Sequence, residues 1–177
     1  MHKVISIYCS SDKDIGEILT GVPYNENKTL AEAIILLRDF INGKPASNGA
    51  FLAAKNVSPE SADPDLFILF LISWAEASFI QSSFVREKLA QAWALIRKAE
   101  NLVTPSTPIE IIADIKILTA TLTGTSGNHT LQEKILWEAI SLLKPSSPRR
   151  PVAIANLALF LAQSGRLAEI ENDIKKI

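Results

Sequence analysis

The sequence has 177 residues, of which 47% are hydrophobic and 21% are charged, and its net charge is −1. These values are typical of a globular chain with a sizeable core; they exclude a disordered chain and give no electrostatic reason for nucleic acid to bind. Cys9 is the sole cysteine, so no intrachain disulfide can form and a reducing compartment is indicated. The apolar runs at 4–9 and 67–74 are too short for a secretory signal and a bilayer span. We therefore expect a cytoplasmic protein with no membrane partner.

The first sixty residues have the least regular pattern. Residues 4–8 fit a short strand or a helical turn, 14–19 fit one or two helical turns, and 49–56 fit a short helix. Between them, Thr29 and Glu32 form a capping-box pattern before an apolar helical stripe that ends at Ile41. Residues 57–63 have the composition of a loop, and we take them as the candidate for any internal boundary.

From Pro64 onward, the helix starts are marked by capping residues. Pro64 follows Asp63, and two further capping-box patterns pair Thr107 with Glu110 and Thr130 with Glu133. Apolar residues then recur at helical spacing. The predicted helices cover residues 66–77, 89–99, 111–122, 131–143, 154–161 and 167–177.

These helices repeat at a nearly constant interval. Pro64 and Pro108 are 44 residues apart, Pro108 and Pro151 are 43 apart, and Trp93 and Trp137 are 44 apart. A fixed period of this size is typical of stacked helix pairs, each of which needs its neighbour to bury its apolar face. We expect the two tryptophans to fill the space between adjacent pairs, where small alanines let the helices approach closely.

Residues 151–170 resemble a tetratricopeptide repeat: Asn156, Leu157 and Ala158 in the first helix, Gly165 at the turn and Glu169 in the second helix follow the order and spacing of that family. The resemblance extends over residues 64–177. It departs from the family in three ways: the period exceeds 40 residues, residues 80–83 lack the turn glycine, and a loop at 123–129 is enlarged. The resemblance implies an all-α, single-domain chain of stacked antiparallel helix hairpins over residues 1–177, an α-solenoid with a right-handed superhelix and an irregular N-terminal part at 1–60.

The resemblance also implies a function, because proteins of this family bind peptides or protein segments in a groove lined by the first helix of each hairpin. We therefore expect a non-catalytic adaptor that needs no cofactor and no metal. Each candidate groove residue also has a simpler explanation as part of a solvated helix face. Asn156 is the strongest candidate because an amide both donates and accepts hydrogen bonds. The candidates are Ser73, Glu76, Asp114, Lys116, Asn156 and Gln163.

An enzyme is the alternative. Residues 4–14, 65–73 and 84–89 resemble parts of a TIR domain, an α/β fold whose members in some cases hydrolyse NAD. That resemblance implies strands at 4–8 and 66–72 and makes Glu87 the catalytic carboxylate. Glu87 also fits the first turn of a helix, where the helix dipole favours an acid.

Other chemistry finds little support. His2 and His129 are the only histidines and have no further ligand at helical spacing, so no metal site is predicted. Cys9 fits a small buried apolar residue better than a nucleophile.

Two features near the C-terminal end of the sequence need separate interpretations. The basic residues Lys144, Arg149 and Arg150 fit a helix end and its turn better than a nucleic-acid patch, because cations there suit the helix dipole. In the last predicted helix, the isoleucines at 170, 174 and 177 lie on one side. We expect that side to pack on a second copy of the chain or on a partner.

Overall fold

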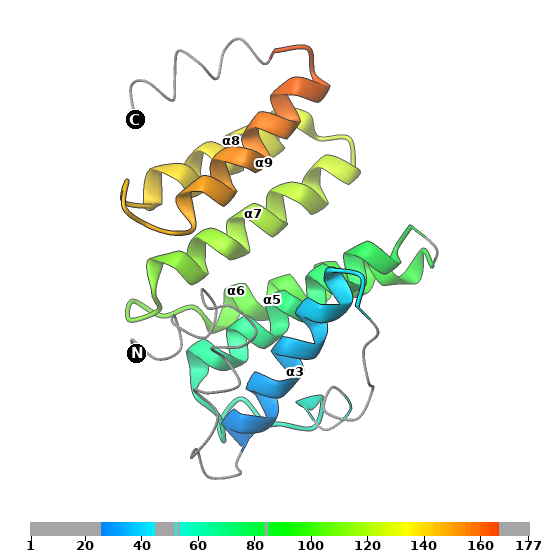
Figure 1. The fold of residues 1–177 in the computed structure, drawn as a ribbon, viewed down its shortest axis with the longest axis vertical. Helices are drawn as coiled ribbons and strands as arrows, with labels where there is room; N and C mark the ends of the chain where they lie inside the picture. The colour runs from blue at the N-terminus through cyan, green and yellow to red at the C-terminus, as the bar shows by residue number, and fades with distance from the viewer. Residues whose placement is uncertain (1–25, 45–51, 53, 84, 167–177) are drawn as a thin grey trace. The chain divides into compact units, whose positions relative to one another are not determined.

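The structure is a computed structural model that describes residues 26–44, 52, 54–83 and 85–166. Within these residues the fold is all-α and contains no strand, as the sequence predicts (Figure 1). The segments predicted at 4–8, 14–19 and 167–177 lie outside the described residues, as do residues 49–51 and 53 of the helix predicted at 49–56; Leu52 and Ala54 of that helix are helical. The helices that the described residues form are α3 (Glu26–Ile41), α5 (Pro64–Gln81), α6 (Glu87–Leu102), α7 (Ile109–Thr125), α8 (His129–Leu142) and α9 (Arg150–Gln163).

The chain divides into two compact units, Met1–Pro105 and Ser106–Ile177. Unit 1 contains α3, α5 and α6, and unit 2 contains α7, α8 and α9. The division falls between Pro105 and Ser106, whereas the loop at 57–63 lies inside unit 1. The single-domain organisation of residues 1–177 stays a prediction.

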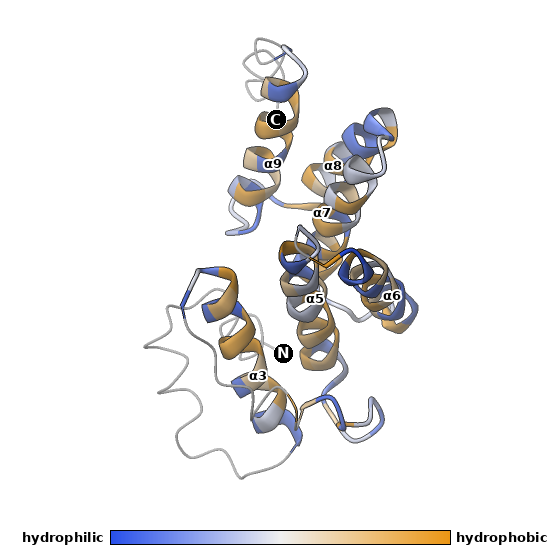
Figure 2. Cartoon of the chain, turned by 90° about the vertical axis from the view of Figure 1, so that its right-hand side faces the viewer, coloured by the Kyte–Doolittle hydropathy of each residue, from blue (hydrophilic) through white to orange (hydrophobic). Residues whose placement is uncertain are grey.

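Helix α5 is the centre of unit 1. Residues 66–73 are each at most 4% exposed, and because they span more than two helical turns, α5 is buried on every side along this stretch. Both α3 and α6 pack against it. The hydropathy colouring in Figure 2 shows the same contrast, with α5 mostly apolar and α6 largely polar. The apolar run at 67–74 is therefore the middle of a core helix.

The helical conformation and the burial of α5 bear on two other interpretations of this segment, a strand and a membrane span. The strand that a TIR-like fold requires at 66–72 is absent, because these residues are helical; the prediction of a strand there was wrong. By length and composition alone, α5 is the one helix in the described part of the chain that could cross a membrane. However, 61% of that span is buried inside the protein. A core helix has this pattern of burial.

The start of α5 is fixed by its cap. The Asp63 side chain accepts a hydrogen bond from the Leu66 N–H at 3.0 Å, and Pro64 occupies the first turn, where its missing N–H costs no hydrogen bond. The Asp63 N–H in turn donates to Asn27 Oδ1 at 2.7 Å. This bond holds the N-terminal ends of α3 and α5 together, so one residue caps a helix and joins it to its neighbour.

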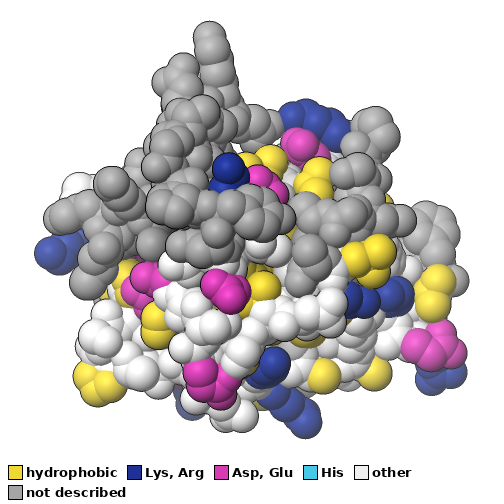
Figure 3. Space-filling view, turned by 90° about the horizontal axis from the view of Figure 1, so that it is seen from below, with side chains coloured by type: hydrophobic (Ala, Val, Ile, Leu, Met, Phe, Trp, Pro, Cys, Tyr) yellow, Lys and Arg dark blue, Asp and Glu magenta, His cyan; other side chains and the backbone are white. Residues whose placement is uncertain are grey.

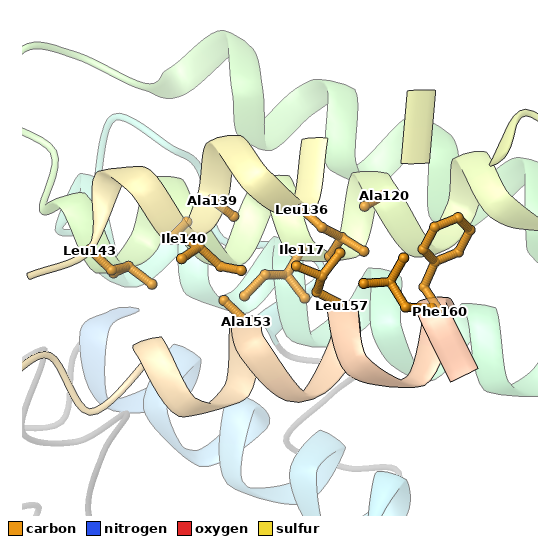
Figure 4. Close-up of a cluster of buried hydrophobic side chains, with 11 residues drawn as sticks. Ile117, Ala120, Leu136, Ala139, Ile140, Leu143, Ala153, Leu157 and Phe160 are labelled. Atoms are coloured by element: carbon orange, nitrogen blue, oxygen red, sulfur yellow. The ribbon is translucent and has the colours of Figure 1, made fainter. Parts of the chain in front are cut away.

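In unit 2, α7 packs against α8 and α8 against α9, with further contacts between α7 and α9, and the three helices share one core cluster. Successive helices run antiparallel (Figure 1). Alanines at the contacts are fully buried and let the helix axes approach, while larger side chains fill the remaining space (Figure 4). The fully buried alanines are Ala113, Ala120, Ala139 and Ala153.

The two tryptophans of the repeat lie in different units. Trp137 packs against the core cluster of unit 2. Trp93 of unit 1 is half-buried, and the Arg97 guanidinium lies 5.9 Å from its ring centroid.

The repeating prolines all lie at the starts of helices. Pro64 lies in the first turn of α5, Pro108 is the residue that precedes α7, and Pro151 lies in the first turn of α9. The two tryptophans of the repeat lie in α6 and α8. The predicted interval therefore corresponds to the successive helix pairs α5–α6 and α7–α8, and α9 begins one interval after α7.

The three capping-box predictions were wrong in detail. Thr29 lies inside α3, which extends back to Glu26, and its side chain is buried. Thr107 precedes the cap position of α7, which Pro108 occupies in an extended conformation. At α8, the Asn128 side chain accepts from the Leu131 N–H at 3.2 Å, so Asn128 and not Thr130 is the cap. Asn caps helices at least as well as Thr, and here it comes first along the chain.

Helices α7 and α9 end in the same turn. Gly127 and Gly165 have φ values of 79° and 71°, a left-handed conformation that glycine adopts without strain. Each glycine N–H bonds to the carbonyl three residues back, and the next N–H bonds to the carbonyl five residues back, which is the Schellman motif. Because α7 continues to Thr125 and α8 begins at His129, the enlarged loop predicted at 123–129 is a short turn.

We expect Asp63→Ala to lower the free energy of unfolding by about 1 kcal/mol, because the Leu66 N–H loses its acceptor. Urea unfolding followed by circular dichroism measures this change. Asp63→Asn is the matched control, since an amide oxygen can still accept the bond. Equal losses for the two variants would show that the cap is not the cause.

Candidate partner-binding surface

The six candidate groove residues are divided between the two units. Ser73 and Glu76 lie on α5 in unit 1; Ser73 is 2% exposed and Glu76 is half-buried. The other four lie in unit 2, on α7 and α9. Ser73 is thus part of the core, where its hydroxyl is closed to a partner.

Asp114 holds the α8–α9 turn against α7. Its side chain is 2% exposed and forms an ion pair with Arg149, whose Nε donates to Asp114 Oδ1 at 2.7 Å and whose Nη2 donates to the same oxygen. One turn earlier on α7, Glu110 Oε1 accepts from the Ser147 hydroxyl at 3.4 Å. The carboxylate predicted to bind a partner is therefore used inside the fold.

Arg150 serves the same turn in a different way. Its side chain is buried, and its Nη1 donates to the main-chain carbonyls of Ile140 and Leu143. These carbonyls belong to the end of α8, where the last main-chain oxygens lack the usual partner one turn further along the helix; the Ile140 carbonyl also accepts from the Leu143 N–H at 3.1 Å. A cation at this position also suits the helix dipole. The interpretation of Arg149 and Arg150 as a helix end and its turn agrees with these contacts.

Lys116 is also engaged within unit 2. Its Nζ lies 2.7 Å from Glu138 Oε2 on α8, with both side chains partly exposed. The hydrogen bond from Lys116, followed by its charge, lowers the pKa of Glu138 below its ordinary value. Lys134 lowers this pKa further and desolvation opposes the shift. The ion pair links α7 to α8 at the surface.

The remaining two candidates lie together on one exposed side of α9. Val152, Asn156, Leu159 and Gln163 are spaced by four, three and four residues, which places them along a single stripe; we call these four residues the α9 face. Leu159 is 60% exposed and Val152 is 36% exposed. The sequence from Pro151 to Gln163 contains no charged residue. The α9 face is therefore an uncharged surface with two exposed apolar side chains and two amides.

Asn156 is partly engaged. Its Nδ2 donates to the Val152 carbonyl at 2.9 Å, one turn back along α9. An amide has two N–H donors and an oxygen acceptor, so this bond uses one of its several hydrogen-bonding sites. The bond also holds the side chain along the helix, beside Val152.

The described charged side chains on the face drawn in Figure 3 are of both signs. Figure 3 shows one face of the molecule, on which Lys and Arg side chains are interspersed with Asp and Glu side chains and small apolar areas. A surface of this kind has no single-sign field that would gather a polyanion. The uncharged α9 face contrasts with it.

Comparisons with protein-family models, with curated proteins and with solved structures each return no match.

Glu87 and His129 are the residues weighed for catalytic or metal chemistry that lie in the described part of the chain. Among these residues, no group of three or more His, Cys, Asp or Glu side chains is placed to hold a metal ion. Glu87 is exposed in the first turn of α6, the position at which the helix dipole favours an acid. His129 is exposed at the start of α8, with its ring centroid 6.2 Å from that of Phe160. Cys9 lies outside the described residues.

The exposure of Val152 and Leu159 was not predicted. The apolar stripe predicted for this helix, Ile154, Leu157, Ala158 and Leu161, is the side that faces the core of unit 2. A signal was nevertheless present, because Val152 and Leu159 are apolar, lie seven residues apart and fall outside that stripe.

We expect Arg149→Met to lower the free energy of unfolding by about 3 kcal/mol, because it leaves the Asp114 carboxylate buried without its cation. The double variant Arg149→Met/Asp114→Asn should lose less, since it removes the buried charge as well. Chemical unfolding of the three proteins measures both differences. A double variant less stable than Arg149→Met would argue against a charge effect.

We expect Lys116→Gln to raise the pKa of Glu138 toward its ordinary value, because Lys116 supplies the two largest causes of the shift. Since the pKa is lowered in the folded protein, the ion pair contributes stability at neutral pH and loses it as the pH falls through that pKa. Carboxyl carbon NMR titration measures the change. Lys134→Gln is the control and should shift the pKa less; an unchanged pKa in Lys116→Gln would contradict the assignment.

Proposed function

We propose that this protein is a non-catalytic, cytoplasmic adaptor that binds a protein or peptide segment on the α9 face. The proline-marked helix pairs support an array similar to tetratricopeptide repeats, and a right-handed superhelical stack is the finer arrangement that we propose for it. In such an array, α9 is the first helix of its pair, the position that lines the binding groove in that family.

The observation that carries this proposal is the exposure of Leu159 on a helix surface without charge. Covering a leucine completely is worth about 2 kcal/mol, so covering the exposed part of Leu159 contributes about 1 kcal/mol to binding. Val152 adds a smaller contribution from the same stripe. A partner that covers both side chains gains affinity without having to desolvate a charged group.

The amides define what kind of partner fits. Asn156 and Gln163 offer donors and acceptors on either side of Leu159 along the stripe, and an extended peptide has unpaired main-chain groups that match both kinds. The apolar side chains of such a peptide would cover Leu159 and Val152. We therefore propose an uncharged peptide segment with at least one large apolar side chain as the partner.

A phage-displayed library of short peptides, selected on the natural protein, tests the proposal. We expect the selected peptides to be rich in apolar residues and to bind Leu159→Glu about tenfold more weakly or worse, because the substitution removes the apolar contact and introduces a charge. Asn156→Ala should also weaken binding. Fluorescence anisotropy with labelled selected peptides measures the affinities.

Ala94→Glu is the matched control, because Ala94 is exposed in the middle of α6 and the variant has the same change in net charge. It should bind as the natural protein does. Equal affinity of the natural protein, Leu159→Glu and Asn156→Ala for every selected peptide would reject the α9 face as the binding surface.

A further inference from the structure

The outward side of α9 has a stripe of alternating large and small apolar residues. Val152, Ala155, Leu159 and Ala162 follow one another at intervals of three, four and three residues, which places them along one line of the helix; we call these four residues the α9 seam. All four are exposed, Leu159 by 60% and Val152 by 36%. The α9 seam shares Val152 and Leu159 with the α9 face, and the two amides of that face lie along one edge of the seam.

The order of sizes along the α9 seam matches its own reverse. A second copy of α9 that runs in the opposite direction places Ala162 of one copy opposite Val152 of the other, and Ala155 opposite Leu159. Each of the four layers of this contact then joins a large side chain to a small one, which lets the two helices approach closely and fill the space between them. Two copies in the same direction would instead place leucine against leucine and alanine against alanine.

The absence of charge also suits contact between two copies. In a two-fold contact the same patch of both copies meets, so a charge near the axis comes close to another of the same sign. The sequence from Pro151 to Gln163 contains no charged residue, whereas Arg97 on α6 and Lys134 on α8 are exposed. In the antiparallel arrangement, the positive end of each helix dipole lies beside the negative end of the other. Helix α9 is therefore better suited to self-contact than α6 or α8.

The size of the α9 seam limits the strength of such a contact. One face of a 14-residue helix is well below the roughly 800 Å² per partner of a standard stable interface. A contact of this size is weak and reversible. A peptide that covers Leu159 can therefore displace the second copy.

We propose that two copies of this chain associate weakly through antiparallel contact between their α9 seams, and that this contact excludes a peptide from the α9 face. The two events exclude each other because both cover Val152 and Leu159. The α9 face is then open at low protein concentration and covered at high concentration. The pairing stands on the α9 seam alone, whereas its effect on peptide binding rests on the proposed function.

Sedimentation equilibrium of the full chain over a range of concentrations tests the pairing. We expect a reversible equilibrium between monomer and dimer, and a dissociation constant about tenfold higher for Leu159→Ala, because two of the four layers lose their large side chain. In Leu159→Ala/Ala155→Leu the large and small residues of these layers exchange places, so the affinity should return. Leu159→Ala/Ala162→Leu is the matched control: its composition is the same, but its leucine lies opposite Val152 of the other copy, and the dissociation constant should stay high. Circular dichroism checks that each variant retains its helical content.

Disulfide crosslinking tests the direction of the two helices. In a Cys9→Ser background, Ala155→Cys is mixed with Leu159→Cys and oxidised. Two cysteines can be joined only when their Cα atoms lie within about 7 Å, and antiparallel pairing brings position 155 of one copy to position 159 of the other. We expect the disulfide between the two different variants to form about tenfold faster than the disulfide between two copies of either one.

Three results would overturn the pairing: a monomer at millimolar protein concentration, equal affinity of the two double variants, or faster crosslinking between two copies of one variant. None of these measurements contains a peptide, so their failure is distinct from a failure of the proposed function. A saturating amount of a library-selected peptide should convert the dimer to a monomer. A dimer that persists with the peptide bound would overturn the exclusion.

Discussion

One helix in each unit is apolar on more than one side, and its burial is the constraint on which the described structure depends. In unit 1 this helix is α5, whose residues 66–73 are all buried, and both α3 and α6 pack against it. In unit 2 it is α7, which packs against α8 and α9. A helix of this length is marginal on its own in water, so most of its stability comes from packing. The polar bonds at Asp63 and Asp114 then fix where the covering elements begin and turn.

The polar residues of the fold act mainly within it. Asp114, Arg149 and Arg150 form a connected set that fixes the α8–α9 turn to α7 and completes the end of α8. A buried carboxylate without its cation is destabilising by several kcal/mol, so these residues are held to their structural partners. Lys116 and Glu138 are nearer the surface, where such pairs contribute less. The polar side chains that stay at the surface of α9 are amides, beside exposed apolar residues.

This arrangement leaves one side of α9 exposed. The α9 face combines Leu159 and Val152 with the amides of Asn156 and Gln163 and carries no charge. Covering its apolar side chains requires no charged group to be desolvated, and this is the physical basis of the proposed binding.

By itself, the sequence determined the helical class, the positions of the helix pairs and the cap at Asp63, because helical periodicity, proline placement and capping depend on residues close together in the chain. It predicted Thr29, Thr107 and Thr130 as helix N-caps, whereas each of these helices begins at another residue nearby. Only the tertiary structure decided which candidate site residues are engaged: Asp114 meets Arg149 35 residues away, and Lys116 meets Glu138 22 residues away. Pairings over such distances are set by the packing of whole helices, which spacing along the chain does not reveal. The same packing left Val152 and Leu159 exposed, because only one side of α9 can face the core of unit 2.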